Sequence, residues 1–386
     1  MSDILIDNDD IAPSIRKSMD RIRDAYRNGP EGHWIVGFSG GKDSTLLLHL
    51  VASMLLHEHG GDRQVIAVTN DTLVESPPVI SYARRVVSEV ERWASAKGLP
   101  LRAEVTLPAM EETFWVNLIG KGYPAPTRNF RWCTDRLKIK PTSRFINKVI
   151  ETSPGGQVVL LLGVRKDESS SRKRSIGRYG EEKFRKHPSI PSCLIFQPIT
   201  DVTTDEVWEF LALNPPPWGG DHRDLIELYR DAGGGECPVV TSLDDAPSCG
   251  TNSSRFGCWT CTVVAKDRSL EGFVKAGNNV YTPLVEFREF IVKLRNDPDT
   301  RMDRKRNNTI VYTSSGRIVK GPFKLEIRKL LLEKLLQLER EYGAKLISDE
   351  EISEIKRIWE EDARLYQTEP RIIYSKRKDK GLGRQG

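Results

Sequence analysis

The chain has 386 residues, of which 38% are hydrophobic and 29% charged, and its net charge is +5. This length accommodates one large α/β domain with an added module, and the charge permits a nucleic-acid partner without requiring one. No stretch approaches the roughly 18 apolar residues of a membrane span, and the acidic first ten residues lack a signal-peptide core. We therefore expect a cytoplasmic protein that does not contact a membrane. Its six cysteines are too few for a disulfide scaffold and favour metal or catalytic roles.

The first part of the chain alternates between helical and strand patterns. Helices are predicted over Pro13–Arg27, from the glycine turn at 39–44 to about His57, over Pro77–Lys97, Glu111–Ile119 and Thr203–Leu213, and from Pro141 onward. Strands are predicted over His33–Phe38, Gln64–Thr69, Leu101–Thr106, Gln157–Val164 and Cys193–Phe196. Strands that alternate with helices predict an α/β fold with a doubly wound parallel sheet.

The character of the chain changes after the proline run at 215–217. Loops with glycine and cysteine occupy about Gly233–Cys261, and charged helices are predicted over Pro283–Arg295, Pro322–Tyr342 and Ile352–Leu365. Ser348 and Glu351 form a capping box for the last helix. The predicted organisation is an N-terminal helix at 1–30, an α/β domain at 31–215, a cysteine-rich module at 216–265, a helical C-terminal region at 266–372 and a disordered basic tail at 373–386.

One stretch, Val36-Gly37-Phe38-Ser39-Gly40-Gly41-Lys42-Asp43-Ser44-Thr45, has the pattern of a strand, a tight turn and a helix. Glycines let backbone amides approach a ligand, and a helix N-terminus adds unpaired N–H groups, so the turn is suited to phosphate. It is not a Walker A loop, because Val36 stands where that pattern needs glycine and Asp43 where it needs Ser or Thr.

Three cysteines cluster in the second half of the chain. Cys258 and Cys261 form a C-x-x-C pair inside a loop, and Cys249 lies nine residues before it. Cys133, outside any apolar periodicity, is the best candidate for a fourth ligand. Four thiolates suit an iron–sulfur cluster or structural zinc, and the spacing leaves both open. Of the remaining cysteines, Cys237 could substitute as a ligand, whereas Cys193 is expected to be a buried core thiol.

Several strings resemble known families. The Ser39–Ser44 string resembles the PP-loop of ATP pyrophosphatases. Four other strings resemble the phosphoadenylylsulfate-reductase branch of those proteins. They are 163–169 (Gly-x-Arg-x-x-Glu-Ser), 197–208, Leu228-Tyr229 and 257–262 (Gly-Cys-x-x-Cys-Thr). Three more resemble the DNA phosphorothioation sulfurtransferases of the Dnd and Ssp systems (the DndC type): Asn70-Asp71-Thr72-Leu73-Val74-Glu75, Gly120-Lys121-Gly122-Tyr123-Pro124 and the string at 131–139 around Cys133.

The resemblance implies an ATP pyrophosphatase with a [4Fe-4S] cluster that helps replace a non-bridging DNA phosphate oxygen with sulfur. Carried over by position, the cluster ligands would be Cys133, Cys249, Cys258 and Cys261, the last three in the cysteine-rich module at 216–265. The domain at 31–215 would be the PP-loop domain, with Ser39, Gly40, Gly41, Lys42, Asp43 and Ser44 on the ATP phosphates. The implied partners are DNA, a cysteine desulfurase as sulfur donor, and other proteins of the phosphorothioation system.

The expected reaction begins with attack of a DNA phosphate oxygen on the α-phosphate of ATP, which releases pyrophosphate. Lys42, Asp43 and Arg165 are the predicted catalytic residues, with loop amides and Lys42 stabilising the leaving charge. Asp43 would hold Mg²⁺ or cap the helix, and Arg165 would meet phosphate or form a surface salt bridge. Other predicted ATP-binding residues are Gly163 and, near adenine, Val68, Thr69 and Asn70. Sulfur, carried as persulfide or cluster-bound sulfide, would then displace AMP.

Three alternatives compete with this function. A reductase of adenylylated sulfate needs a cysteine near its C-terminus, but none follows Cys261. A tRNA-thiolating enzyme fits the strings around Asp71 and Cys133 poorly, and a non-catalytic subunit would not need the intact loop.

Basic residues gather in three places, and each group is either a solvated surface or a contact with DNA phosphates. They are Arg172, Lys173, Arg174, Arg178, Lys183, Arg185 and Lys186, then Arg301, Arg304, Lys305 and Arg306, and finally the tail.

Overall fold

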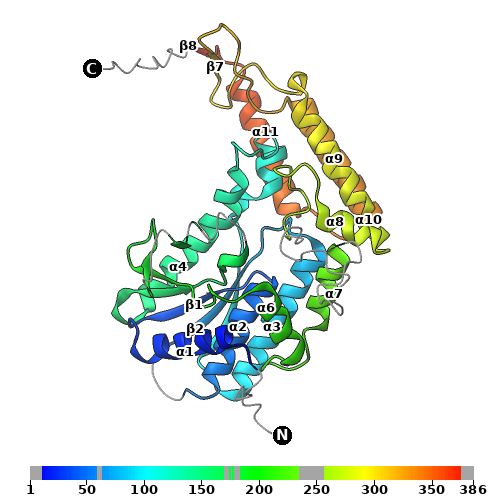
Figure 1. Ribbon diagram of the computed structural model, residues 1–386. Helices are drawn as coiled ribbons and strands as arrows, with labels where there is room; N and C mark the ends of the chain where they lie inside the picture. Colours follow the sequence, from blue (N-terminus) through cyan, green and yellow to red (C-terminus); the bar gives the residue numbers. More distant parts are fainter. Residues whose placement is uncertain are drawn as a thin grey trace, which may run out of the picture. The chain divides into compact units, whose positions relative to one another are not determined.

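The computed structural model describes residues 11–58, 63–168, 174, 176–177, 183–233 and 256–374 (Figure 1). Contacts divide the chain into two compact units. The first unit comprises Met1–Pro108, Leu137–Trp259 and Asp267–Asn279, and the second comprises Ala109–Arg136, Thr260–Lys266 and Val280–Gly386. None of the described helices is both long and apolar enough to cross a membrane.

A six-stranded sheet in the order β3-β2-β1-β4-β6-β5 lies at the centre of the first unit. The parallel strands are β1 His33–Gly37, β2 Val65–Asn70, β3 Leu101–Thr106, β4 Val158–Leu161 and β6 Cys193–Phe196. The predicted α/β fold with a parallel sheet is therefore confirmed. Arg185 and Lys186, expected in a basic surface segment, form the short edge strand β5, which runs antiparallel to β6. Strands β2 and β3 extend the sheet on one side of β1, and β4 and β6 extend it on the other. A reversal of strand order of this kind opens a crevice at the carboxyl ends of the strands beside β1.

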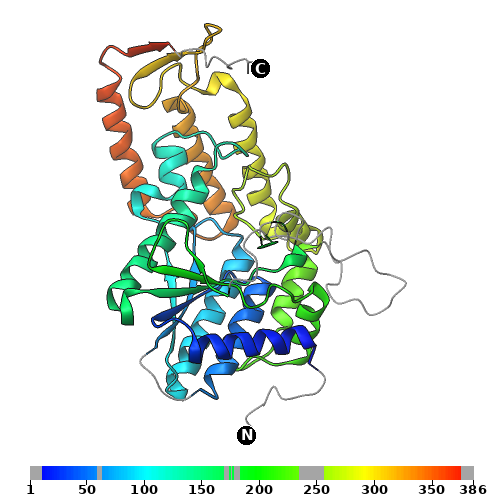
Figure 2. The same ribbon diagram turned by 60° about the vertical axis from the view of Figure 1, so that its left-hand side comes forward.

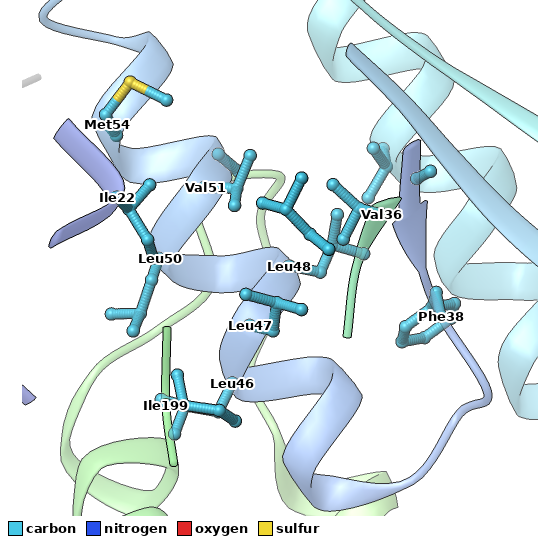
Figure 3. Close-up of a cluster of buried hydrophobic side chains, with 14 of the residues drawn as sticks. Ile22, Val36, Phe38, Leu46, Leu47, Leu48, Leu50, Val51, Met54 and Ile199 are labelled. Carbon is cyan, nitrogen blue, oxygen red and sulfur yellow. The ribbon is translucent and has the colours of Figure 1, made fainter. Parts of the chain in front are cut away.

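Helices cover both faces of this sheet. Buried side chains of α1 (Pro13–Asn28), α2 (Lys42–Leu55), α3 (Pro77–Lys97) and α6 (Thr204–Leu213) share one cluster with Trp34 and Val36 of β1. On the other face, α4 (Lys140–Thr152) packs against Ile35 and β4. Helix α2 is buried at 13 of its 14 residues, and Figure 3 shows its apolar side chains between Ile22 of α1 on one side and Val36 of β1 with Phe38, which follows β1, on the other. The helix that follows the glycine turn is therefore a core element of this unit.

Two further helices belong to the first unit. Helix α7 (Arg223–Ala232) lies where the sequence predicted only the cysteine-rich module, and α8 (Arg268–Lys275) lies just beyond it. The two helices are in close contact, because a Cβ added at Gly272 would lie 2.0 Å from the Ala232 carbonyl oxygen.

The segment around Pro141 departs from the predicted α-helix. A π-helical turn over Thr134–Ile139 leads directly into α4, so the helix begins before Pro141. Proline has no N–H to donate to the carbonyl four residues earlier, which here is Leu137. That carbonyl accepts instead from Asn70 Nδ2 at 2.9 Å. The predicted helix over Glu111–Ile119 is likewise a 3₁₀ turn at Met110–Glu112 followed by a π-helical turn at Val116–Gly120.

The second unit contains α9 (Thr282–Asn296), α10 (Leu325–Tyr342) and α11 (Asp349–Leu365), as predicted, with the Ser348–Glu351 capping box (Figure 2, yellow to red). A parallel pair of short strands, β7 (Thr309–Tyr312) and β8 (Arg371–Tyr374), was not predicted. Strand β8 includes the first two residues of the predicted tail, and the rest of that tail lies outside the described residues.

The segment 109–136 was expected within the domain at 31–215 but belongs to the second unit. Trp115 Nε1 donates to the Leu346 carbonyl at 2.7 Å, and Trp359 Nε1 donates to the Ile119 carbonyl at 3.0 Å. A Cβ added at Gly120 would lie 3.3 Å from Ile355 and Ile358 of α11. These contacts hold the segment on the C-terminal helices, so the compact units do not follow the linear order of the chain.

Candidate active site

A cavity of about 540 Å³ lies in the first unit, beside the glycine turn and the ends of β1, β2 and β4. It brings together ten of the predicted nucleotide-binding residues: Ser39, Gly41, Lys42, Asp43, Ser44, Val68, Thr69, Asn70, Gly163 and Arg165. Gly40 is not among the lining residues. Its φ of +73° favours glycine, and an added Cβ would lie 3.0 Å from the Cβ of Ala83, so Gly40 serves the turn itself.

The turn is closed by its own serines. Ser44 Oγ accepts the Ser39 N–H at 3.1 Å and donates to the Gly41 carbonyl at 2.9 Å. Gly163 lies against the turn from β4, since a Cβ there would come within 2.7 Å of the Asp43 carbonyl oxygen. These contacts fix the loop backbone before any ligand arrives, which lowers the cost of ordering it on binding.

Arg165 and Asp43 form a buried ion pair under the loop. The Arg165 side chain is 1% exposed, and its Nε donates to Asp43 Oδ1 at 2.7 Å. Its other nitrogens donate to the Val202 carbonyl at 3.1 Å and to Thr204 Oγ1 at 3.2 Å. The surface salt bridge considered for Arg165 is therefore wrong. Arg165 acts in this structure as a positioning residue for Asp43.

The structure also decides one of the two roles considered for Asp43. Helix α2 has Gly41 at its N-cap and no side-chain cap, so the capping role is wrong. Both Asp43 carboxylate oxygens face cations, because Lys42 Nζ lies 3.4 Å from Oδ2 while Arg165 holds Oδ1. The Mg²⁺ role stays a prediction.

Tyr229 of α7 is a site residue that the sequence did not single out beyond the Leu228-Tyr229 string. Its hydroxyl accepts the Lys42 backbone N–H at 3.2 Å, and its ring lies 5.4 Å from Lys42 Nζ. The rings of Trp208 and Phe256 pack against it at 4.9 and 4.5 Å. Burial raises the pKa of Tyr229, so its hydroxyl stays protonated. This hydroxyl accepts a hydrogen bond from the Lys42 N–H, which would otherwise be available to a phosphate at the N-terminus of the helix.

Apolar residues also line the cavity, among them Ile35, Leu160 and Val79. Thr69 contributes a buried hydroxyl that has no hydrogen-bond partner among the described residues. The Asn70 side chain is already engaged, since its Oδ1 accepts from Thr106 Oγ1 at 2.9 Å and its Nδ2 donates to Leu137. Apolar side chains and an unpaired hydroxyl, in one lining with Lys42 and the loop that carries N–H donors, suit a ligand with a flat base and phosphates.

Cys258 is attached to the cavity through the backbone. The Ser76 N–H donates to the Gly257 carbonyl and the Trp259 N–H to the Val74 carbonyl, both at 3.1 Å, so Glu75 and Cys258 form an antiparallel bridge. Glu75 lines the cavity and pairs with Lys138 at 2.9 Å. Cys258 Sγ itself lies 3.5 Å from Thr72 Oγ1. The 72–76 segment thus joins one cysteine of the C-x-x-C pair to this cavity.

Cys133 and Cys261 belong to the second unit. Burial raises the pKa of the Cys133 thiol, and the nearby Cys261 raises that pKa further. Cys249 and Cys237 lie outside the described residues. In the part of the chain that the structure describes, no group of three or more His, Cys, Asp or Glu side chains forms a metal-binding set, and the four-cysteine set stays a prediction. Cys193 is the buried core thiol expected, and burial raises its pKa to about 11.

The cluster of basic residues at 301–306 is mostly engaged within the second unit. Arg301 donates to the Lys320 and Gly321 carbonyls, Arg304 to Asn308 and to the Tyr366 carbonyl, and Lys305 to the Lys320 carbonyl, while Arg306 pairs with Asp362. These side chains hold loops of the second unit together, so the interpretation of this group as a purely solvated surface is wrong. Of the earlier basic cluster, Lys183 pairs with Asp24, and Arg172, Lys173 and Arg178 lie outside the described residues.

Comparison with known proteins adds three relatives of low similarity. An uncharacterized protein of Methanocaldococcus jannaschii is 29% identical over 184 residues, which are 48% of this chain and 32% of that protein, so the match spans about a third of the relative. The FMN adenylyltransferase of Candida glabrata is 14% identical, with 57% of this chain and 59% of that chain covered and a TM-score of 0.32. The U34-tRNA thiolase NcsA of Methanococcus maripaludis, solved with its [4Fe-4S] cluster, is 16% identical, with 55% and 70% covered and a TM-score of 0.30. TM-scores this low carry no weight for function.

A family model matches a longer part of this chain than any of these three proteins does. The family model of the phosphoadenosine phosphosulfate reductase domain matches residues 33–264. The matched span begins at β1 and includes the glycine turn, the Arg165 segment and the C-x-x-C pair. The chain therefore belongs to the phosphoadenosine phosphosulfate reductase domain family and carries its PP-loop, nucleotide-utilising α/β domain.

Proposed function

We propose that this protein is an ATP pyrophosphatase and sulfurtransferase of DNA backbone phosphorothioation. The observation that carries the proposal is the bridge between Glu75, which lines the nucleotide cavity, and Cys258 of the C-x-x-C pair. It places a thiol on the same backbone ladder as the nucleotide site. DNA as the substrate is supported by the resemblance of the strings at 70–75, 120–124 and 131–139 to the sulfurtransferases of phosphorothioation systems.

The reaction would begin at the loop. A non-bridging oxygen of a DNA phosphate attacks the α-phosphorus of ATP, and the bond from that phosphorus to the bridging oxygen breaks. Pyrophosphate leaves with the bonding electrons, stabilised by Lys42 and by the N–H groups at the start of α2. Arg165 holds Asp43, and Tyr229 gives up the Lys42 N–H to a phosphate oxygen. A sulfide nucleophile then attacks the DNA phosphorus and displaces AMP without a change of oxidation state, so the displaced DNA oxygen leaves on AMP.

Four thiols are the proposed holders of a [4Fe-4S] cluster: Cys133, Cys249, Cys258 and Cys261. Thiolate is the usual protein ligand of such clusters, and the interaction between Cys133 and Cys261 fits a shared centre. When bound, the cluster supplies iron that can hold sulfide. The protein's own contribution is to fix the cysteine backbones, through the 74–76 bridge at Cys258 and through Arg288, which donates to the Cys261 carbonyl at 2.8 Å.

The proposal is tested by incubating anaerobically purified protein with α-labelled ATP, with and without DNA. AMP and pyrophosphate are the expected products, and ADP with phosphate would reject the pyrophosphatase assignment. Removing Mg²⁺ with a chelator is expected to stop the reaction. Lys42→Ala should abolish pyrophosphate release and keep the brown chromophore. As the control, Lys166→Ala removes an exposed lysine that pairs with Asp201, and it should change neither pyrophosphate release nor the chromophore.

The cluster needs a second pair of variants. Cys258→Ser should remove the chromophore and sulfur incorporation, whereas Cys193→Ala, which replaces a buried thiol of β6, should keep both. A colourless anaerobic protein that contains zinc would reject the cluster. If tRNA rather than DNA stimulates pyrophosphate release and gains sulfur, the substrate is tRNA. Release of sulfite from an adenylylated sulfate would assign the chain to the reductases instead.

A further inference from the structure

Two cations of the second unit converge on one neutral oxygen. Arg136 Nη1 donates to the Asn117 side-chain oxygen, and Lys121 Nζ lies 3.4 Å from the same atom. Lys121 also donates to the Glu111 carbonyl. Arg136 Nη2 donates to the Tyr123 hydroxyl at 3.4 Å. All three acceptors are neutral, so these contacts do not compensate the two positive charges.

A second pair of cations in this unit shares a single carboxylate. Arg328 Nη1 lies 2.8 Å from Asp362 Oδ2, and Arg306 Nε lies 3.4 Å from Asp362 Oδ1. The Nε of each arginine is buried without a hydrogen-bond partner among the described residues. Arg328 also donates to the Gly120 carbonyl, which places this pair beside Lys121. One carboxylate cannot neutralise two guanidinium groups, so the second pair adds to the excess of positive charge.

The two pairs of cations act on each other. Burial and the positive charges of Arg136 and Arg306 lower the pKa of Lys121 to about 8. Glu112 and Glu111 act in the opposite direction, but each less strongly. Like charges that are held close together in a partly buried place raise one another's free energy. A bound anion would relieve this repulsion, so the arrangement favours an anionic ligand.

The neutral partners hold the first pair in a fixed arrangement. Asn117 is buried in the π-helical turn that precedes Lys121, and its Nδ2 donates to the Thr113 carbonyl at 2.8 Å. This bond leaves the amide oxygen directed at Lys121 and Arg136. The Arg136 guanidinium also lies over the Tyr123 ring, 4.9 Å from its centre. Guanidinium and ammonium groups are the usual partners of phosphate oxygens, and cations that are ordered beforehand lose little entropy on binding.

The chain around these two cations also carries an exposed aromatic ring. Residues 120–136 contain four Lys and Arg against one Asp. Phe130 is 45% exposed, and the centre of its ring lies 6.4 Å from that of the Tyr123 ring. Arg128 and Arg131, close to Phe130 in the chain, are exposed as well. Cations for phosphates beside an exposed ring that can stack on a base are typical of proteins that bind single-stranded nucleic acid. A free phosphate would have no use for the ring.

We propose that Lys121 and Arg136 bind a backbone phosphate of single-stranded DNA and that Phe130 stacks on a neighbouring base. The non-bridging phosphate oxygens accept hydrogen bonds from both cations, in place of the Asn117 oxygen. A single strand is favoured over a duplex because its bases have free faces. The choice of DNA over RNA rests on the proposed function, whereas the phosphate site itself rests on the cations.

The test measures binding of a labelled single-stranded DNA oligonucleotide to the full chain by fluorescence anisotropy over a series of salt concentrations. Lys121→Gln and Arg136→Gln are each expected to weaken binding about tenfold. Each should also flatten the plot of log affinity against log salt by ~0.7, which corresponds to the loss of one phosphate contact. Phe130→Ala should weaken binding about tenfold at an unchanged slope, and Phe130→Tyr should keep the affinity.

The matched control replaces Lys334 and Arg340, two exposed cations of α10 in the same unit, with glutamine. Denaturant unfolding checks that each variant is folded, and Arg136→Lys, which keeps the charge, should bind more tightly than Arg136→Gln. An equally large loss of affinity in the control, unchanged affinity in Lys121→Gln and Arg136→Gln, or tighter binding of the duplex would overturn the proposal.

Two further arms separate the sources of the phosphate. Inorganic phosphate that displaces the DNA more than chloride of the same ionic strength does, with no effect of Phe130→Ala, would mean that the site takes free phosphate. Tighter binding of RNA of the same sequence would overturn the choice of DNA. Pyrophosphate release from ATP in the presence of DNA is followed in parallel. Its absence from the wild type rejects the proposed function, whereas unchanged DNA binding in both glutamine variants of an active protein rejects this site alone.

Discussion

Arg165 in the first unit and Arg288 in the second are each 1% exposed, and each holds a segment that carries candidate chemistry. The charge of Arg165 is met by the Asp43 carboxylate at 2.7 Å, with Asp167 at 3.6 Å. Arg288 donates mainly to backbone carbonyls, those of Cys261 at 2.8 Å and Val264 at 2.6 Å, and its acidic partner Glu289 is 53% exposed.

This difference separates two kinds of site. Around Arg165 the charges are balanced, so a bound phosphate would depend on Lys42 and the loop amides for its attraction. Around Arg288 a buried guanidinium binds the backbone carbonyls of Cys261 and Val264, and its acidic partner Glu289 is exposed. The first arrangement supports a loop through a charged pair, and the second supports the cysteine segment through its backbone carbonyls.

The largest expected effect comes from breaking the balanced pair. Arg165→Ala leaves the Asp43 carboxylate, which is only 17% exposed, without its main partner. The free energy of unfolding should therefore fall by about 3–5 kcal/mol, and nucleotide binding should be abolished. Denaturant unfolding measures the stability. Lys166→Ala, next in the chain and 47% exposed, should cost under about 1 kcal/mol. Equal effects of the two variants would show that the Arg165 pair is not the support of the loop.

Acid should destabilise the first unit selectively, because all six histidines of the chain lie in it. His49 Nδ1 lies 3.2 Å from His222 Nε2, and burial lowers the pKa of His49 well below its usual value and that of His222 from 6.5 to about 4. Between these pH values the unfolded chain binds protons that the folded chain does not, so stability falls as pH decreases from about 6.5 to about 4. His222 alone accounts for up to about 3 kcal/mol.

Hydrogen exchange across this pH range checks the prediction. Protection factors in α2 and α7, which correct for the slower intrinsic exchange at low pH, should fall more than those in α10 of the second unit as the pH decreases. A variant with His222→Gln should lose the part of that pH dependence that comes from His222 and keep the part that comes from the buried His49. Acid destabilisation that persists unchanged in this variant would point to other groups.

Arg288→Ala should loosen the cysteine segment and lower the free energy of unfolding by about 2 kcal/mol. The variant leaves buried backbone carbonyls without a hydrogen-bond donor, but it also removes a buried charge, so the decrease is smaller than for Arg165→Ala. The expected result is faster hydrogen exchange at 260–266 and poorer retention of the chromophore in the anaerobic protein. Arg340→Ala, at an exposed position of α10, is the control and should change neither. Intact retention of the chromophore would contradict a role for Arg288 in holding the cysteine segment.

The smallest effect is expected at Tyr229. Tyr229→Phe keeps the ring over Lys42 and removes only the hydroxyl that occupies the Lys42 N–H, so stability should fall by about 1 kcal/mol. Because a phosphate no longer competes with that hydroxyl, ATP should bind a few-fold tighter by calorimetry. Weaker ATP binding would mean that the hydroxyl contacts the nucleotide instead of giving way to it.

Local signals in the sequence determined much of this protein. The strand, glycine turn and helix at 33–55, the strand at Leu101–Thr106 and the capping box at Ser348–Glu351 follow from contacts between residues a few positions apart. Strand periodicity also placed Cys193 in the core, and the residues predicted to bind nucleotide gather at one cavity because parallel strands end at the same edge of the sheet.

Tertiary structure alone decided which partners the buried polar groups take. Arg165 and Asp43 are 122 residues apart in the chain, and Tyr229 and Lys42 are 187 apart. Leu137 accepts from Asn70 because Pro141 cannot donate to it, and 109–136 joins the C-terminal helices through its tryptophans. A buried donor or acceptor must be satisfied by whichever group the packing of distant elements brings within about 3 Å, and no pattern of neighbouring residues encodes that choice.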